Sequence, residues 1–207
     1  MRLDCSTYSL YQSNRERTHK MSQYGKAAYW DERYTRDPEP FDWYQRYSGI
    51  SDKLSAHVKK SDNILMLGCG NSRLTEDMYV DGFTSIENID ISPVAIKQMK
   101  EKHADKKSLN WKVMDAIKLD FPDETFDCIV DKGTMDSILC GEASTGNVAK
   151  ACKECVRVLK PGGVYIVISY GIPDNRLGYL ESEEYPWQVS VHTVPKPTVN
   201  AAAIPDS

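Results

Sequence analysis

Residues 64–72 read ILMLGCGNS, and this stretch decides the fold class. The unbroken apolar run at residues 64–67 predicts a strand buried on both faces, as in a parallel sheet. Gly68 and Gly70 follow, and glycine lets the backbone turn tightly and approach a ligand closely. A helix is predicted from about Ser72. A glycine pair alone is a weak signal, but its place between a buried strand and a helix indicates a ligand-binding turn.

Strands and helices alternate along the rest of the chain. Ser92 and Pro93 form a typical helix start, because a serine cap is followed by a proline in the first turn. Further strands are predicted at residues 84–89, 109–113, 126–130 and 164–169. The alternation predicts an α/β fold, with helices covering both faces of a doubly wound, mostly parallel, Rossmann-like sheet.

The 207-residue chain has no break in composition, so we expect a single domain. The polar residues 1–20 predict a disordered leader, and residues 21–207 are expected to form the domain. Within it, helical patterns at residues 21–60 predict an amino-terminal lid, and the alternating pattern predicts that residues 61–207 form the sheet core.

The composition argues against several function classes. The net charge is −4, so the basic footprint of a nucleic-acid-binding protein is not visible. The lysine-rich residues 97–107 are interrupted by Glu101 and Asp105, which favours a solvated face. No apolar run reaches the ~18 residues of a membrane span, and the chain does not start like a signal peptide. We therefore expect a cytoplasmic protein that binds neither nucleic acid nor membranes.

Two acidic residues end strands next to the glycine turn. Asp90 ends the second predicted strand, at a spacing from the glycines that suits an acid bonding both hydroxyls of a ribose. Asp115 ends the third strand, where an acceptor could meet an adenine amino group. Because both acids lie beside the glycine turn, a role in binding a nucleoside is favoured over the alternative that each is only a solvated residue or a helix cap. The dinucleotide fingerprint needs a third glycine where this chain has Arg73, so a cofactor without phosphates fits better.

Several motifs resemble those of the class I, or seven-strand, methyltransferases that use S-adenosyl-L-methionine. They are ILMLGCGNS, NIDIS, MDAIKLDF, FDCIVDKGTMDSIL and LKPGG. With YWDERY and FDWY ahead of them, they look most like the branch that methylates lysines of elongation factor 1A. The resemblance runs from about Tyr24 to Pro197. It implies a protein-lysine methyltransferase with an elongation factor 1A-like protein substrate, and we expect a monomer.

The resemblance also implies roles for matching residues. Asp90 would hold the ribose of S-adenosyl-L-methionine and Ile91 would pack on its adenine. The other residues that the resemblance assigns to the cofactor are Trp30, Tyr34, Trp43, Gly68, Cys69, Gly70, Asp115, Ala116 and Lys132. The aromatic members would close over the cofactor from the amino-terminal side, and a sulfonium cation is attracted to aromatic faces.

Two acids after the fourth strand, Asp131 and Asp136, are the candidate catalytic residues. A lysine acceptor has an unperturbed pKa of about 10.4 and must be neutral to attack a methyl group. A nearby carboxylate can orient the amine and receive its proton. A helix cap for Asp131 and a solvated turn for Asp136 are equally good interpretations.

No metal site is expected. Cys152 and Cys155 have the spacing of half a zinc site, but both lie on an apolar helix stripe that favours core packing. The four histidines lack metal-ligand spacing.

The carboxyl-terminal part departs from the family pattern. Residues 184–195 alternate in hydropathy and offer one candidate strand, whereas residues 198–207 do not read as a strand. We therefore expect the last strand of the sheet to be missing. Two alternatives to the lysine methyltransferase stay open: a methyltransferase for a small molecule or another protein, and a catalytically silent relative that binds the cofactor.

Overall fold

The computed structural model describes residues 23–197. The expected leader at residues 1–20 and the final piece at residues 198–207 lie outside the described residues. None of the described helices combines the length and the apolar character needed to span a bilayer.

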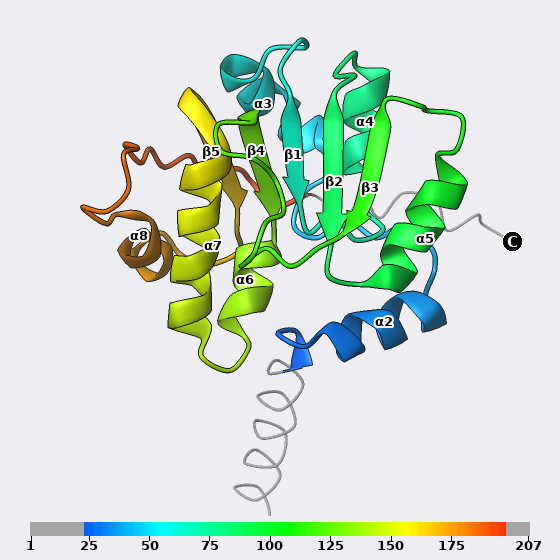
Figure 1. Ribbon diagram of the computed structural model, residues 1–207, viewed down its shortest axis with the longest axis horizontal. Coiled ribbons are helices and arrows are strands. Elements are labelled where there is room, and N and C mark those ends of the chain that lie inside the picture. The colour runs from blue at the N-terminus through cyan, green and yellow to red at the C-terminus, as the bar shows by residue number, and fades with distance from the viewer. Residues whose placement is uncertain (1–22, 198–207) are drawn as a thin grey trace, which may run out of the picture.

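The centre of the fold is a five-stranded parallel sheet in the order β3-β2-β1-β4-β5 (Figure 1). Its strands are β1 (Ile64–Leu67), β2 (Ile86–Asp90), β3 (Leu109–Val113), β4 (Phe126–Lys132) and β5 (Leu159–Ile168). The strand order reverses beside β1, which has β2 on one side and β4 on the other. Ligands bind outside the carboxyl ends of the strands at such a switch point.

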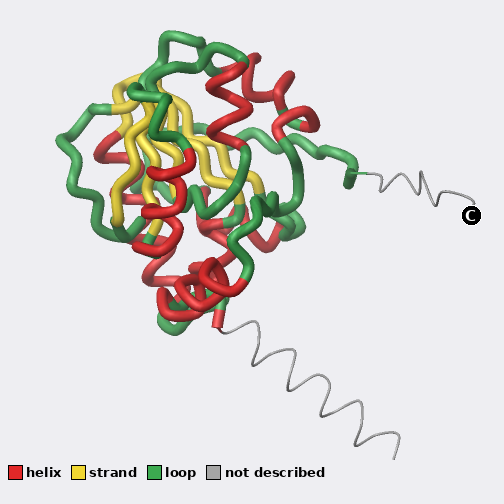
Figure 2. Tube along the Cα trace, turned by 90° about the vertical axis from the view of Figure 1, so that its right-hand side faces the viewer, coloured by secondary structure: helices red, strands yellow, loops and turns green. Residues whose placement is uncertain are grey.

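Helices cover both faces of the sheet, as the alternating sequence predicts (Figure 2). On one face lie α3 (Ser51–His57), α4 (Leu74–Val80) and α5 (Pro93–Lys102), which pack with alternate side chains of the strands into one apolar cluster. On the other face, α7 (Ser144–Val158) packs against the remaining strand side chains. The prediction of a doubly wound α/β fold is confirmed.

The helix start predicted at Ser92 is also confirmed. The Ser92 side chain accepts a hydrogen bond from the Ala95 N–H at 3.2 Å, and Pro93 is the first residue of α5. A proline is tolerated there because its missing N–H would have no partner within the helix.

One helix lies apart from the two layers. Figure 1 shows α2 (Ala27–Arg36) across the carboxyl ends of the strands, below the arrowheads. The chain then passes through the short 3₁₀ helix η1 (Tyr47–Gly49) into α3. The amino-terminal segment thus covers the end of the sheet where a ligand is expected.

The structure differs from the sequence prediction at the carboxyl-terminal side. Residues 184–195 form no strand, so that prediction is wrong. Trp187 instead packs against Tyr165 and Tyr185, with ring centroids 5.6 and 5.0 Å away, and its indole N–H donates to the Leu180 carbonyl at 2.9 Å. The alternation reflects side-chain packing beside the sheet edge. Within residues 23–197 no strand follows β5.

Two short helices were not predicted. They are α6 (Thr134–Leu139), which directly follows β4, and α8 (Asp174–Leu180), which follows β5. Strand β5 also begins earlier than predicted, because the backbone pairs with β4 from Leu159, before the glycines of the expected turn.

Candidate functional site

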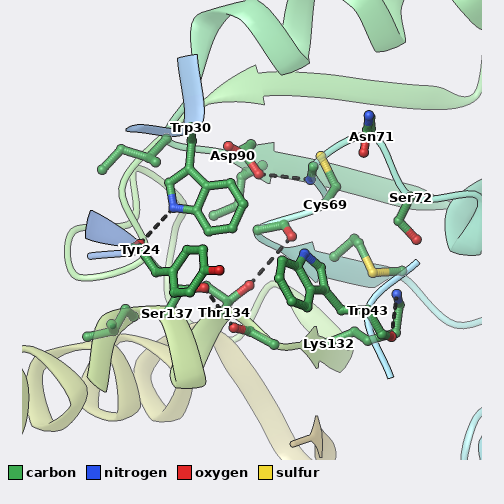
Figure 3. A pocket seen from close by; sticks show the side chains of 18 of the residues that line it. Tyr24, Trp30, Trp43, Cys69, Asn71, Ser72, Asp90, Lys132, Thr134 and Ser137 are labelled. Atoms are coloured by element: carbon green, nitrogen blue, oxygen red, sulfur yellow. Dashed lines mark hydrogen bonds between the residues drawn. The ribbon is translucent and has the colours of Figure 1, made fainter. Parts of the chain in front are cut away.

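A cavity opens at the carboxyl ends of β1, β2 and β4, beneath α2 (Figure 3). Every residue that the sequence analysis assigns to the cofactor lines this cavity. Sequence reasoning missed further lining residues, among them Tyr24, Lys26, Phe41, Asn71, Ser72, Met114, Thr134 and Ser137. The available signal was the quoted motifs themselves, which contain Phe41, Asn71, Ser72, Met114, Thr134 and Ser137.

The glycine loop forms one wall of the cavity. Gly68 and Gly70 have φ angles of 64° and 51°, a left-handed conformation that side chains other than glycine rarely adopt. A Cβ atom on Gly68 would collide with the Thr134 hydroxyl, and one on Gly70 would lie 2.5 Å from the Tyr34 hydroxyl. Both positions therefore require glycine, and the loop packs closely under the lid.

Asp90 closes the loop from the end of β2. Its Oδ2 accepts a hydrogen bond from the Gly70 N–H at 2.8 Å, and its Oδ1 accepts one from the Ser92 N–H at 2.9 Å. Burial raises the pKa of this carboxyl to about 6, against the opposing effect of these two hydrogen bonds. A carboxylate oxygen can accept more than one hydrogen bond, so Asp90 can also receive two neighbouring hydroxyl groups from the cavity.

The end of β3 supplies another wall. Asp115 turns the chain there, since its Oδ1 accepts a hydrogen bond from the Ile117 N–H at 3.1 Å. Ile91, which follows β2, lines the cavity and is 38% exposed. An exposed branched apolar side chain beside a carboxylate suits a flat heterocycle with a polar edge.

Aromatic rings cover the cavity from the amino-terminal side. The Trp30 ring stacks on those of Tyr34 and Tyr24 at centroid distances of 5.7 and 5.8 Å, and its Nε1 donates to the Tyr24 carbonyl at 2.7 Å. Trp43 meets Trp30 edge-on at 6.4 Å. Figure 3 shows Trp30 and Trp43 around the space in front of Asp90. Such a lid excludes water and offers electron-rich faces to a cation.

Lys132 holds the lid against the sheet. Its Nζ donates to Asp42 Oδ1 at 3.0 Å and to the Trp43 carbonyl at 3.2 Å. The Ser72 hydroxyl donates to the same oxygen of Asp42. Burial lowers the pKa of Lys132, although the Asp42 charge and hydrogen bond act in the opposite direction. The end of β4, the glycine loop and the segment before Trp43 are thus tied together.

Asp131 does not line the cavity. It is 1% exposed, and it accepts hydrogen bonds from the N–H groups of Thr134 and Met135 at 2.8 and 3.0 Å and from the Tyr165 hydroxyl at 3.2 Å. Burial raises its pKa to about 7, against the effect of these hydrogen bonds. These contacts match the helix-cap interpretation, because Asp131 satisfies the first free donors of α6.

Asp136 lies on α6, beside the cavity. Its carboxylate accepts hydrogen bonds from the Ser169 hydroxyl at 2.6 Å, the Tyr170 N–H at 3.0 Å and Arg176 Nε at 2.9 Å. Burial alone would raise its pKa, but these donors, a hydrogen bond from Tyr44 and the Arg176 charge together lower it. Asp136 is therefore a fixed negative charge rather than a solvated turn residue.

Cys152 and Cys155 are fully buried in the apolar clusters around α7, as the packing interpretation predicts. Within residues 23–197, no three histidine, cysteine, aspartate or glutamate side chains gather as metal ligands.

Comparison with known proteins places this geometry in a family. Residues 65–167 match a family described as "Methyltransferase domain". EEF1A lysine methyltransferase 4 from Mus musculus is 34% identical over 180 residues, which are 82% of this chain and 71% of the relative. The chain belongs to this methyltransferase family.

A second relative is much longer than this methyltransferase. The eEF1A lysine and N-terminal methyltransferase from Mus musculus is 37% identical over 179 residues, which are 83% of this chain but 25% of the relative. Among solved structures, a SAM-dependent methyltransferase from Methanosarcina mazei aligns with a TM-score of 0.53 and 24% identity, over 68% of this chain and 64% of that one. That likeness supports the fold.

The methyltransferase uses S-adenosyl-L-methionine, and the cavity fits this cofactor. Asp90 is suited to a pair of ribose hydroxyls, Ile91 and Asp115 to an adenine, and the stacked rings of Trp30 and Tyr34 to a sulfonium. When bound, the cofactor supplies an electrophilic methyl group. The protein around it supplies hydrogen-bond acceptors, aromatic faces and exclusion of water.

We expect the cofactor affinity of the methyltransferase to fall on acidification. Asp90 has a pKa of about 6 and must be ionised to accept two hydroxyl groups while it keeps its bonds to the glycine loop. At about pH 5 only about a tenth of it is ionised, so the Kd for S-adenosyl-L-methionine should be ~10-fold higher than at about pH 8. Calorimetric titration at both pH values measures this. Asp90→Asn should bind weakly at both, and a wild-type Kd that does not change with pH would contradict the assignment.

Proposed function

We propose that this methyltransferase acts in the cytoplasm, as a monomer, on a lysine of an elongation factor 1A-like protein. The observation that carries the proposal is the 34% identity to EEF1A lysine methyltransferase 4, which extends over 82% of this chain and 71% of that relative. The name of the second mouse relative refers to the same protein substrate.

The proposed cofactor contacts follow the cavity lining. Asp90 binds the ribose, while Ile91, Asp115 and Ala116 surround the adenine. Gly68, Cys69 and Gly70 approach the methionine portion, and Trp30, Tyr34 and Trp43 cover the sulfonium. Lys132 acts through Asp42 and the Trp43 carbonyl, so its proposed role is to hold the lid closed.

Methyl transfer to lysine is a direct displacement. The lone pair of the neutral amine forms a bond to the methyl carbon as the bond from carbon to sulfur breaks, and the amine then releases a proton. Alignment of the reacting atoms can supply ~7–11 kcal/mol of such a barrier. We assign Asp136 to the acceptor side, because it lies next to the cavity residues Thr134 and Ser137 and carries a stable negative charge. Asp131 supports it by capping α6.

The proposal is tested by incubating the purified chain with labelled S-adenosyl-L-methionine and purified elongation factor 1A. We expect label on one lysine, and replacement of that lysine by arginine should abolish the signal. Asp90→Ala should transfer no label. If only small molecules or other proteins were labelled, the acceptor would not be elongation factor 1A. Cofactor binding without transfer to any acceptor would identify a silent relative.

A further inference from the structure

Two stacked tyrosines lie beside the cofactor cavity. Tyr44 follows the lid residue Trp43 and has a φ of 63°, which is costly for a bulky side chain. Its ring packs on Gly133, a lining residue of the cavity, where a Cβ atom would come within 3.3 Å of Tyr44 Cε2. On its other side the ring stacks on Tyr170, with centroids 5.8 Å apart and planes 24° apart. The pair therefore extends outward from the cavity wall.

Asp136 lies next to both members of the pair. Its carboxylate accepts a hydrogen bond from the Tyr170 N–H at 3.0 Å, and its charge contributes to raising the pKa of Tyr44. Tyr170 lies at the surface, and the residue is 63% exposed. The result is an aromatic face at the surface, backed by a partly buried carboxylate. An aromatic face of this kind attracts ammonium groups.

A lysine of the chain's own carboxyl-terminal segment lies at the hydroxyl edge of this face. Lys196 Nζ lies 4.8 Å from the centroid of the Tyr170 ring and donates to the Tyr170 hydroxyl at 2.7 Å. The carbonyl of the preceding Pro195 accepts a hydrogen bond from the side chain of Gln45, which directly follows Tyr44. The segment is thus held by its Pro195 carbonyl at Gln45 and by its Lys196 ammonium group at Tyr170.

We propose that the Tyr44–Tyr170 pair is a docking site for a lysine-bearing segment of the protein acceptor, and that Lys196 competes for it in cis. This inference rests on the proposed function and names the acceptor side of the same site. The ligand chemistry follows from Lys196, since Tyr170 of the pair already contacts a primary ammonium group. The net charge of −4 also favours a basic partner over an acidic one.

The test measures binding of a short polylysine peptide to the cofactor-loaded full chain by calorimetry. Lys196→Gln should tighten binding ~5-fold, the size of effect expected when a cation–π contact in cis is removed. The matched control is Lys107→Gln, which removes the same charge at an exposed lysine between α5 and β3 and should leave the affinity unchanged. When Lys196→Gln is combined with Tyr170→Ala, the increase in peptide affinity should disappear. When it is combined with Tyr170→Phe, most of that increase should remain.

Equal affinities for Lys196→Gln and Lys107→Gln would overturn the inference, as would a gain that persists without the Tyr170 ring. Thermal unfolding checks that each variant is folded. Methylation of elongation factor 1A is measured in parallel and decides the proposed function separately. If the peptide result holds but elongation factor 1A receives no label, the docking site stands and the proposed acceptor fails. If elongation factor 1A is labelled but the peptide affinities do not differ, the proposed acceptor stands and the docking site fails.

Discussion

Replacing Asp90 with alanine should weaken binding of S-adenosyl-L-methionine by about 100-fold or more. The carboxylate organises the glycine loop through the Gly70 and Ser92 N–H groups and presents its remaining lone pairs to the cavity. Hydrogen bonds to a charged group contribute about 1.5–3 kcal/mol each. Loss of two of them to the ribose therefore amounts to about 3 kcal/mol at least, which corresponds to about 100-fold in Kd.

Calorimetric titration of the variant with the cofactor gives this number directly. Asp105→Ala is the matched control, because Asp105 is an exposed acid that pairs with its neighbour Lys106. It should bind like the wild type. Thermal unfolding checks that Asp90→Ala is folded at the temperature of the titration. Wild-type affinity in a folded Asp90→Ala variant would remove the ribose assignment, and with it the proposed orientation of the cofactor.

The sheet and the cavity wall were predictable because their signals are local. A strand buried on both faces must be apolar at every position, so the bounds of β1 could be read from the sequence as residues 64–67. Parallel strands bring their carboxyl ends to one edge, so Asp90 and Asp115 had to lie near the glycine loop. The order of the residues along the chain already contained this information.

The contacts that hold the amino-terminal lid could not be predicted from local sequence patterns. Lys132 and Asp42 are 90 positions apart, and nothing in the sequence near either residue pairs them. Helix α6 was missed because its six residues are too few to show a period, and because its start is a glycine at φ 90° without a side-chain cap of its own. The side chain that satisfies its first donors, Asp131, precedes that glycine. A carboxylate between a strand and a short helix therefore looked equally suited to catalysis and to capping.

Replacing Asp131 with alanine should distinguish a capping role from a catalytic one. We expect the variant to be less stable than the wild type, but its folded fraction should keep its methyltransferase activity. The variant loses the cap of α6, which contributes about 1 kcal/mol, and leaves the Tyr165 hydroxyl and two N–H groups without an acceptor in a buried place. Unsatisfied buried donors cost about 1–3 kcal/mol, so the free energy of unfolding should fall by about 3 kcal/mol.

For a chain of this size that loss corresponds to a decrease in Tm of about 6–12 °C. Thermal unfolding and kcat, measured well below the Tm, give the two readouts. Tyr165→Phe is the matched control, because it removes one donor to Asp131 and keeps the ring that packs on Trp187, so its Tm should fall by much less. A catalytic group would behave in the opposite way. If Asp131→Ala kept the wild-type Tm and cofactor affinity but lost kcat by about 100-fold or more, as removal of a group that transfers the proton does, Asp131 would belong to the reacting atoms rather than to the support of α6.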